Sequence, residues 1–306
     1  MEIEVCVSDN GSTDRTESVV LEHANSMALK YVKNEENVGV AKNILRAVDL
    51  SEGEFVWLVG DDDVLLIDSL ARLDKLMQRN PDVDFYYGNA FIIQLSHVDS
   101  FGGRFDTMRL ERQAQRFSSY RTDGPVKFFD LINPEVSFDF LAGMFLSIFR
   151  RSIWQSGVES ISESSLDASG SFSTVDNTFP HIRVFANAFS GRPAYFNSSP
   201  LIGCINGVRE WAPLFPLVRS FRLPEAVEMY RKAGLPFFQY VGCRNFSLSH
   251  FLPDVTRMLI SPRAAGLRYA GWNFDLSKNL VFPNFYLSPL IDWLRRMREK
   301  ERSSQW

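Results

Sequence analysis

The stretch VSDNGSTDRT (Val7–Thr16) follows an apolar strand pattern with a run of small polar residues. A second stretch, LVGDDDVL (Leu58–Leu65), follows another apolar run with three adjacent carboxylates. In open α/β sheets the carboxyl ends of the strands meet at one edge, and ligands bind in the crevice outside that edge. The two stretches therefore predict an α/β fold with one shared polar site at the strand ends.

The bulk composition bounds the class of protein. The chain has 306 residues, of which 45% are hydrophobic, so it can build a sizeable core in one or two domains. The net charge of −4 argues against a broad nucleic-acid-binding surface, and we expect no nucleic-acid partner. The three cysteines are far apart and form no CxxC pair, which indicates a reducing compartment.

No targeting segment is visible in the sequence. Glu2 and Glu4 stand where a secretory signal would need basic residues. No run approaches the roughly 18 apolar residues of a membrane-spanning helix. We therefore expect a cytoplasmic protein.

The first 95 residues alternate between strand and helix patterns at short spacing. The strand patterns cover residues 3–7, 29–32, 55–59 and 84–93. The helix patterns cover residues 16–24, 40–50 and 68–78, and Ser12, Thr13 or Asp14 can cap the first of them. This alternation predicts an open, mostly parallel, Rossmann-type sheet flanked by helices.

The order of elements loosens after residue 95. Residues 96–122 are polar and rich in Arg and Ser, which indicates an irregular insertion, and residues 160–174 are a Ser-rich loop pattern. Residues 140–149 are strand-like, and from about Pro216 onward the patterns are helical. The chain is accordingly divided into three segments, namely 1–95, 96–215 and a helical C-terminal region at 216–306.

Three adjacent carboxylates, Asp61, Asp62 and Asp63, follow the third strand pattern. Such groups repel one another unless a cation is present. One interpretation is a solvated acidic turn, whose charges favour the N-terminus of the next helix. The other is a site for Mg²⁺ or Mn²⁺, which are held by one or two carboxylates and completed by phosphates and water. The residues alone leave both interpretations open.

The two acidic stretches together resemble the nucleotide-binding half of family 2 glycosyltransferases, which have the GT-A fold. The matching parts follow the family's order: the GSTD turn, NVG with the later Asn43, a helix ending in SEGE, an apolar strand and the GDDD turn. The resemblance covers residues 3–89 and is thinner through FLAGMFLSIFRRSIW (140–154). Within the family, the O-antigen and polysaccharide type, an abequosyltransferase-like group, is the most similar.

The resemblance implies a metal-assisted and inverting transfer of a hexosyl or deoxyhexosyl group. The donor is a nucleoside-diphosphate sugar, and the acceptor is a glycan or a lipid-linked oligosaccharide. Segment 1–95 then becomes the nucleotide-sugar-binding half and segment 96–215 the acceptor-side half.

The resemblance also assigns residues to the donor site. It places Asp9 and Asn10 at the nucleobase and Lys42 beside the nucleotide. Asp61 and Asp63 match the DxD pair, with Asp63 as the direct ligand of Mg²⁺ or Mn²⁺. Asp61 then contacts ribose or reaches the metal through water. The remaining assignments are Asp62 to the nucleotide and His181 to the metal as a further ligand.

The base that deprotonates the acceptor hydroxyl is expected in STVDNTFPHIRVF (173–185), where Asp176 matches the family context. Asp167 and Asp139 are the lesser candidates, and Asp-Asn-Thr before a helix is also an ordinary N-cap pattern. On the acceptor side, Trp211 can stack on a sugar ring and Arg209 can contact a diphosphate or an anionic acceptor. Core packing and ordinary surface exposure explain these two residues equally well.

The family begins with one further strand and helix, whereas this chain starts at what matches the family's second strand. Three explanations stay open: the start codon is misassigned, the chain is a fragment, or the protein has lost that wall of the nucleobase pocket. The last would leave an open sheet edge and remove half of the nucleobase contacts. A truncated, non-catalytic relative acting as a binding subunit is one alternative function. A nucleotidyltransferase is another, although the Gly-rich loop typical of that class is not visible, and no G-x-G-x-x-G supports a dinucleotide enzyme.

The C-terminal segment SPLIDWLRRMREKERSSQW (288–306) places apolar residues ahead of a basic cluster. It suits a peripheral contact with the inner face of the cytoplasmic membrane, and equally a solvated helix end. An oligomer contact is a further alternative for the region 216–306. The sequence leaves the oligomeric state open.

Overall fold

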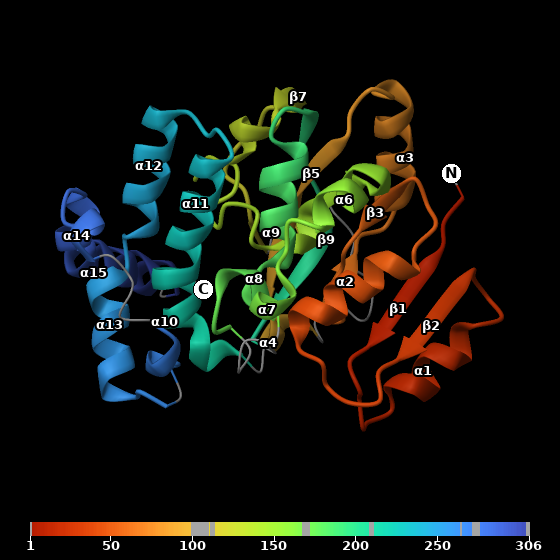
Figure 1. Cartoon of the computed structure of the whole chain (residues 1–306), viewed down its shortest axis with the longest axis horizontal. Helices are drawn as coiled ribbons and strands as arrows, with labels where there is room; N and C mark the ends of the chain where they lie inside the picture. Colours follow the sequence, from red (N-terminus) through yellow and green to blue (C-terminus); the bar gives the residue numbers. More distant parts are fainter. Residues whose placement is uncertain are drawn as a thin grey trace.

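The structure is a computed structural model that describes residues 2–98, 110, 114–166, 172–207, 211–263, 265–270 and 276–303. A central sheet carries helices on its faces, the first strands lie at one end, and the C-terminal helices lie at the other (Figure 1). The predicted α/β class with flanking helices and a helical C-terminal region is confirmed. No helix in these described ranges combines the length and the hydropathy needed to cross a membrane.

The N-terminal part forms a small sheet of its own. Strand β1 (Val5–Asp9) pairs in parallel with β2 (Leu29–Lys33), and helix α1 (Thr16–His23) connects them. Helix α2 (Val40–Leu50) packs against β1 and buries Ala41, Ile44 and Val48, the face that its 3.6-residue spacing predicts. The first two predicted helices are thus confirmed to within one residue.

The main sheet has seven strands in the order β3-β8-β5-β9-β4, with β6 beside β5 and β7 beside β9. Their bounds are β3 Phe55–Trp57, β4 Asp63–Leu65, β5 Phe85–Gln94, β6 Gln115–Arg116, β7 Gly124–Lys127, β8 Ser147–Arg150 and β9 Pro193–Asn206. Among the described strands of this sheet, β5 and β9 are the one pair that runs in parallel, so the share of parallel pairing is smaller than expected. An apolar pattern shows that a strand is buried on both faces, but it does not show the direction of the strand. The direction of pairing here follows from the insertion of β8 between β3 and β5.

Strand β9 is the longest strand and was not predicted. It begins at Pro193, and its sequence is interrupted by Pro200 and the polar stretch at 197–199, which do not fit a regular alternation. The structure accommodates this stretch as a bulge, because Tyr87 of β5 faces Phe196 while Asn89 already faces Pro200. The strand therefore continues on both sides of an irregularity that its sequence marks as a turn.

A buried amide closes this bulge. The side chain of Asn89 donates from Nδ2 to the carbonyl oxygens of Ser198 (3.0 Å) and Ser118 (3.3 Å). Its Oδ1 accepts from the backbone N–H groups of Ser118 (2.8 Å) and Ala90 (2.9 Å). Asn89 is fully buried, so these four contacts satisfy backbone groups that would otherwise face an apolar interior.

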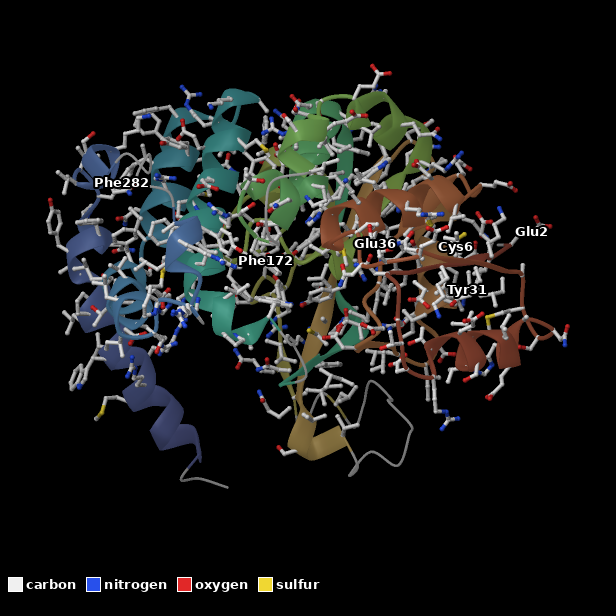
Figure 2. The ribbon with its side chains drawn as sticks, turned by 60° about the horizontal axis from the view of Figure 1, so that its bottom comes forward. Glu2, Cys6, Tyr31, Glu36, Phe172 and Phe282 are labelled. Carbon is white, nitrogen blue, oxygen red and sulfur yellow. The ribbon has the colours of Figure 1, made fainter. Side chains whose placement is uncertain are left out.

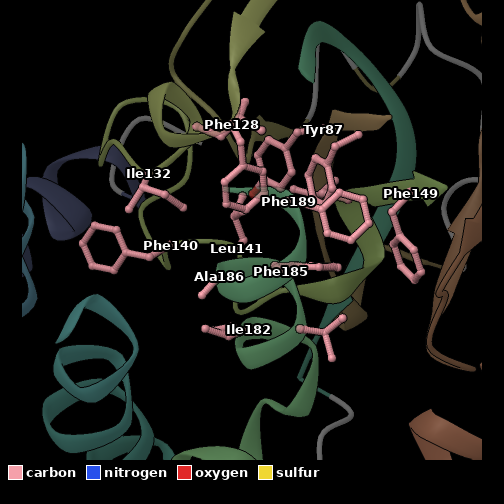
Figure 3. Close-up of a cluster of buried hydrophobic side chains, with 14 of the residues drawn as sticks. Tyr87, Phe128, Ile132, Phe140, Leu141, Phe149, Ile182, Phe185, Ala186 and Phe189 are labelled. Carbon is pink, nitrogen blue, oxygen red and sulfur yellow. The ribbon is translucent and has the colours of Figure 1, made fainter. Parts of the chain in front are cut away.

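An aromatic cluster fills the space between the sheet and the helices (Figure 3). Phe85 of β5 packs edge-to-face against Phe128, Phe185 and Phe189, with ring centroids 5.1, 4.9 and 5.4 Å away. Phe185 and Phe189 belong to a π-helical turn that continues from α9 (Pro180–Val184). The same cluster includes residues of α2 and α12, so it extends from the N-terminal half into the C-terminal helices.

The predicted strand at 140–149 is shorter than expected. Only β8 (Ser147–Arg150) forms, after a 3-10 turn at Met144–Leu146. Phe140 and Leu141 have positive φ angles of 55° and 67° and are fully buried. Asp139 closes this turn by accepting from the N–H of Gly143 (2.7 Å), so the apolar run folds back on itself instead of extending.

The remaining helices cover the sheet or form the C-terminal region. Near the sheet they are α3 Ser69–Arg79, α4 Leu95–Val98, α6 Arg151–Val158, α7 Glu163–Leu166 and α8 Val175–Thr178. In the C-terminal region they are α10 Phe215–Leu217, α11 Leu223–Lys232, α12 Phe237–Ser247, α13 Phe251–Ile260, α14 Leu276–Asn279 and α15 Pro283–Ser303. Helices α10, α13 and α15 contribute to a second core cluster, which includes Phe251 and Phe285 with ring centroids 4.9 Å apart. Most of the polar insertion expected at 96–122 lies outside the described residues.

We expect Asn89→Ala to lower the free energy of unfolding by about 3 kcal/mol, because it leaves buried N–H and C=O groups of the bulge without hydrogen bonds. Urea unfolding followed by circular dichroism measures the change. The matched control is Asn197→Ala in the same bulge. The Asn197 amide makes one exposed contact to Ser199, so this substitution should lower the free energy of unfolding by less than about 1 kcal/mol. Equal effects of the two substitutions would contradict the role assigned to Asn89.

Candidate functional site

The turn after β1 is built on Asp9, its last residue. The buried carboxylate of Asp9 accepts from the Ser12 N–H at Oδ1 (2.7 Å) and from the Tyr31 hydroxyl at Oδ2 (2.8 Å). Burial opposes ionisation, yet these hydrogen bonds hold the pKa of Asp9 below its ordinary value. Burial and the adjacent carboxylate raise the pKa of Tyr31 to about 12. Asp9 is therefore a fixed anion at the strand end.

Asn10, the neighbour of Asp9, joins this turn to the loop after β2. Its Oδ1 accepts from the Val38 N–H (3.0 Å), and its Nδ2 donates to Asn37 Oδ1 (2.9 Å). Gly11 makes the close approach possible, because a Cβ atom there would lie 2.8 Å from the carbonyl carbon of Glu36. Its φ of 78° also favours glycine. The two loops are thus held together as one surface in the N-terminal lobe, where Figure 2 labels Tyr31 and Glu36.

Beneath this surface lies a polar network that the sequence analysis did not assign to the site. Asn43 of α2 accepts from the Ser8 hydroxyl (2.7 Å) and from Asn34 Nδ2 (3.1 Å), and it donates to the Ser8 carbonyl (2.9 Å). Arg46 donates to Asn34, which is buried. The signal in the sequence was the position of Asn34, two residues after the strand pattern at 29–32. Lys42, predicted beside the nucleotide, is exposed on the first turn of α2.

The three carboxylates form a tight turn between β3 and β4. The Asp63 N–H donates to the Gly60 carbonyl (3.2 Å), and Asp63 begins β4 opposite Cys204 of β9. A Cβ atom on Gly60 would lie 2.7 Å from Asp62 Oδ1 and 3.4 Å from Asp63 Oδ2. The side chains of Asp62 and Asp63 therefore converge over the bare Cα of Gly60, whereas Asp61 is exposed.

This donor set fits a divalent cation that also binds substrate phosphates. Mg²⁺ and Mn²⁺ prefer oxygen ligands and are commonly bound through one or two carboxylates. Two carboxylates share the space that glycine leaves open, and β9 fixes the backbone of Asp63. In the described part of the chain, no group of three or more His, Cys, Asp or Glu side chains could hold a metal ion by itself.

His181, predicted as a further metal ligand, lies in the aromatic core instead. Its Nε2 donates to the carbonyl oxygens of Leu141 and Ala142, both at 3.1 Å. Its ring packs between Phe179 and Phe185, with centroids 6.0 and 5.5 Å away. Burial lowers the pKa of His181 to about 4 although the two carbonyl contacts oppose the shift. Burial therefore keeps the ring neutral, and its N–H group supports the 140–142 turn.

The predicted base Asp176 lies in the short helix α8, behind an N-cap at Thr174. Thr174 and Asn177 make the reciprocal cap contacts, so Asp176 is not the capping residue. The buried carboxylate of Asp176 accepts from Arg183 Nε (2.6 Å). Of the lesser candidates, Asp139 accepts from the Ser137 hydroxyl (2.8 Å), and Asp167 lies outside the described residues.

The predicted acceptor residues are only partly described. Trp211 is half-buried, and its ring lies between Phe172 and Phe215 with centroids 5.6 and 6.2 Å away. Arg209 lies outside the described residues. A separate cavity of about 710 Å³ opens between residues 132–135 and α12, and none of the predicted site residues lines it.

Comparison with protein families gives one match over much of the chain. The family model described as Glycosyl transferase family 2 matches residues 1–173. Abequosyltransferase RfbV of Salmonella typhimurium is 38% identical over 85 residues, which cover 27% of this chain and 26% of that protein. A PGL/p-HBAD biosynthesis glycosyltransferase of Mycobacterium tuberculosis is 31% identical over 111 residues, which cover 36% of this chain and 43% of that protein. This chain therefore spans less than half of the length of these curated relatives.

Solved structures match the fold over nearly the whole chain. The crystal structure of S. aureus TarS 1-349 has a TM-score of 0.53 at 17% identity, covering 94% of this chain and 69% of that one. The same protein in complex with UDP-GlcNAc has a TM-score of 0.54 at 16% identity, covering 94% of this chain and 70% of that one. At these sequence identities the similarity shows a shared fold and nothing more specific.

The buried His181 predicts an acid-sensitive fold. The pKa of about 4 in the folded state lies below the ordinary histidine value of 6.5, so the stabilising effect is complete above pH 6.5 and is lost as the pH falls toward 4. We expect the free energy of unfolding to fall by about 2 kcal/mol more in the wild type than in His181→Gln over this window. Urea titrations at a series of pH values measure it.

The control is His23→Gln, which changes an exposed ring on α1 and should leave the pH dependence of the wild type unaltered. Gln at position 181 keeps a donor for the two carbonyl groups, so the variant tests titration rather than the loss of a contact. A wild-type pH slope in the His181→Gln variant would contradict the prediction.

Proposed function

The chain belongs to glycosyl transferase family 2, as its acidic turns predicted, and from this premise we propose a nucleotide-sugar glycosyltransferase. The donor is a nucleoside-diphosphate sugar, and the acceptor is a hydroxyl group of a glycan or a lipid-linked oligosaccharide. The reaction is a single displacement with inversion at the anomeric carbon. The observation that carries the proposal is the convergence of Asp62 and Asp63 over Gly60, at the end of a core strand.

The joined loops after β1 and β2 are the proposed nucleoside subsite. Asp9 is an anion with spare acceptor capacity, since each carboxylate oxygen can accept more than one hydrogen bond. A nucleobase N–H is a suitable donor for it. The Asn10 amide can pair with a pyrimidine edge, and exposed Lys42 can reach a phosphate. The network of Ser8, Asn34 and Asn43 holds these groups in place, which is what a preorganised site requires.

Asp62 and Asp63 are the proposed holders of Mg²⁺ or Mn²⁺, with Asp61 directed to ribose or to a metal-bound water. Bound there, the cation would neutralise the charge that develops on the diphosphate leaving group. Asp63 is the first choice for direct contact because its backbone is fixed by pairing with β9. Gly60 contributes by leaving space where a larger residue would push the two carboxylates apart.

Asp176 is the proposed base that takes the proton of the acceptor hydroxyl. Its second carboxylate oxygen remains for the acceptor while Arg183 holds the first. Arg183 therefore acts as a positioning residue. Trp211 is the proposed acceptor-stacking surface, because the face of an aromatic ring suits the C–H face of a sugar, and Arg209 would contact an anionic group.

We expect one nucleoside diphosphate among UDP, CDP, GDP and dTDP to bind in the presence of Mn²⁺, as measured by calorimetric titration. Asp63→Asn should weaken this binding roughly a hundredfold, because the neutral amide is a poor ligand for a hard cation. Gly60→Ala should weaken it too, since the new methyl group would meet Asp62 at 2.7 Å.

The control is Asp49→Asn, which removes an exposed carboxylate from α2 and should bind like the wild type. Thermal unfolding of all variants without nucleotide shows whether the fold is intact. Failure of every diphosphate to bind the wild type would refute the donor site and favour a non-catalytic role. If a nucleoside diphosphate binds tightly without metal, and Asp63→Asn leaves that binding unchanged, the metal site is refuted while the nucleoside subsite stands.

We expect Asp176→Asn to lower kcat by roughly a thousandfold with a small change in the KM of the donor, because the amide keeps the contact to Arg183 but cannot accept the proton. Steady-state kinetics with saturating donor and acceptor measure the change in kcat. Asp139→Asn serves as the comparison, because its carboxylate holds a backbone turn. If Asp176→Asn retains kcat and Asp139→Asn loses it, Asp139 is the base.

A further inference from the structure

Helix α15 presents an apolar face that nothing in the described structure covers. Six large apolar side chains on it are 43–55% exposed: Tyr286, Leu287, Leu290, Trp293, Leu294 and Met297. Their spacing of i, i+1, i+4, i+7, i+8 and i+11 places them on one side of an α-helix. They form a continuous stripe along three turns, which we call the α15 stripe.

The opposite side of α15 is anchored in the protein. Phe285 packs on Phe251 with ring centroids 4.9 Å apart, and the Ser288 hydroxyl accepts from the Leu252 N–H (3.1 Å). Asp292 Oδ1 lies 3.1 Å from Nδ1 of the buried His250. These contacts fix the rotation of the helix, so the α15 stripe faces away from α12 and α13. Figure 2 shows α15, in dark blue, running out from the body at its C-terminal end.

The charges beside the stripe are basic. Within residues 283–303 the sequence has five Arg or Lys and three Asp or Glu, although the whole chain has a net charge of −4. Asp292 is turned inward toward His250, and its other oxygen accepts from Arg296. Arg295 and Arg296 are exposed residues, although Arg295 Nη1 also lies 2.8 Å from His250 Nε2, and Arg298, Lys300 and Arg302 follow in the sequence. An acidic protein thus carries a basic, apolar helix at one end.

We propose that the α15 stripe docks on the surface of an anionic lipid bilayer, with the helix lying in the plane of the interface. Apolar side chains with flanking Arg and Lys are the pattern of helices that lie at the boundary between headgroups and acyl chains. Trp293 and Tyr286 suit this boundary, because each has a large apolar ring with a polar atom at its edge. The flanking arginines would then face lipid phosphates.

The charges favour a lipid surface over a second copy of the chain. A twofold contact between two α15 stripes would bring the basic flanks of both copies close together, and like charges at an interface oppose association. A bilayer containing phosphatidylglycerol offers negative charge along the whole length of the helix. This inference does not rest on the proposed function, because lipid binding can be measured without a donor or an acceptor.

The test is flotation of the full chain with vesicles of phosphatidylcholine alone and of phosphatidylcholine mixed with phosphatidylglycerol. We expect binding to the mixed vesicles and at least roughly tenfold weaker binding to the neutral ones. The variant Leu290→Gln/Trp293→Gln/Leu294→Gln should lose more than roughly tenfold in affinity for the mixed vesicles. Its three side chains are exposed, so the fold should persist, and circular dichroism checks this.

The matched control is Val19→Gln/Leu21→Gln/Met27→Gln, which removes equally exposed apolar side chains at the opposite end of the molecule and should bind like the wild type. Arg296→Gln should weaken binding by roughly fivefold and reduce its salt dependence. No binding of the wild type to either vesicle, or equal loss in the control, would overturn the proposal. The oligomeric state is measured by light scattering. If the wild type is a dimer that does not bind vesicles, and the α15 variant is a monomer, the α15 stripe is the contact with a second copy of the chain.

Discussion

The side-chain amide of Asn89 is the contact on which the sheet depends. It is fully buried at the irregularity between β5 and β9, and it makes four hydrogen bonds to backbone groups of three segments. One of these hydrogen bonds holds the Ser198 carbonyl group of β9, within the polar stretch at 197–199. Strand β9 in turn pairs with β5, β7 and β4, so this one amide supports the edge that carries the acidic turn. A buried polar network of this kind is stable only when it is fully satisfied, and here it is.

The same principle organises the N-terminal lobe. Small polar side chains at the ends of β1 and β2 make hydrogen bonds with one another and with α2, so the loops after the two strands have little freedom. Asp9 receives two of these contacts and stays ionised despite its burial. Such rigidity benefits a site that must hold a nucleotide, because less conformational entropy is lost when the ligand binds. The fold and the proposed donor site therefore share their supporting contacts.

The C-terminal helices serve a different purpose from the sheet. They bury Phe251, Phe282 and Phe285 against one another, and a pair formed by Asp254 and Arg219 lies beside this second core. Only one side of α15 takes part, which leaves its apolar stripe for an external surface. If the stripe lies on a bilayer, the proposed transfer would take place close to the membrane surface. A lipid-linked acceptor would then diffuse in two dimensions toward the site.

The sequence by itself determined the local elements and the family. The period of the apolar residues located α2, a helix pattern preceded by capping residues located α1 to within one residue, and the GSTD and GDDD turns indicated family 2 glycosyltransferases. These features depend on neighbours in the chain, which periodicity and turn chemistry report directly. Only the tertiary structure decided the rest: strand β9, the antiparallel insertion of β8, and the burial of His181 against the carbonyl groups of Leu141 and Ala142. Each of these depends on partners far away in the sequence, and the pattern of one segment does not specify which distant segment satisfies its hydrogen bonds.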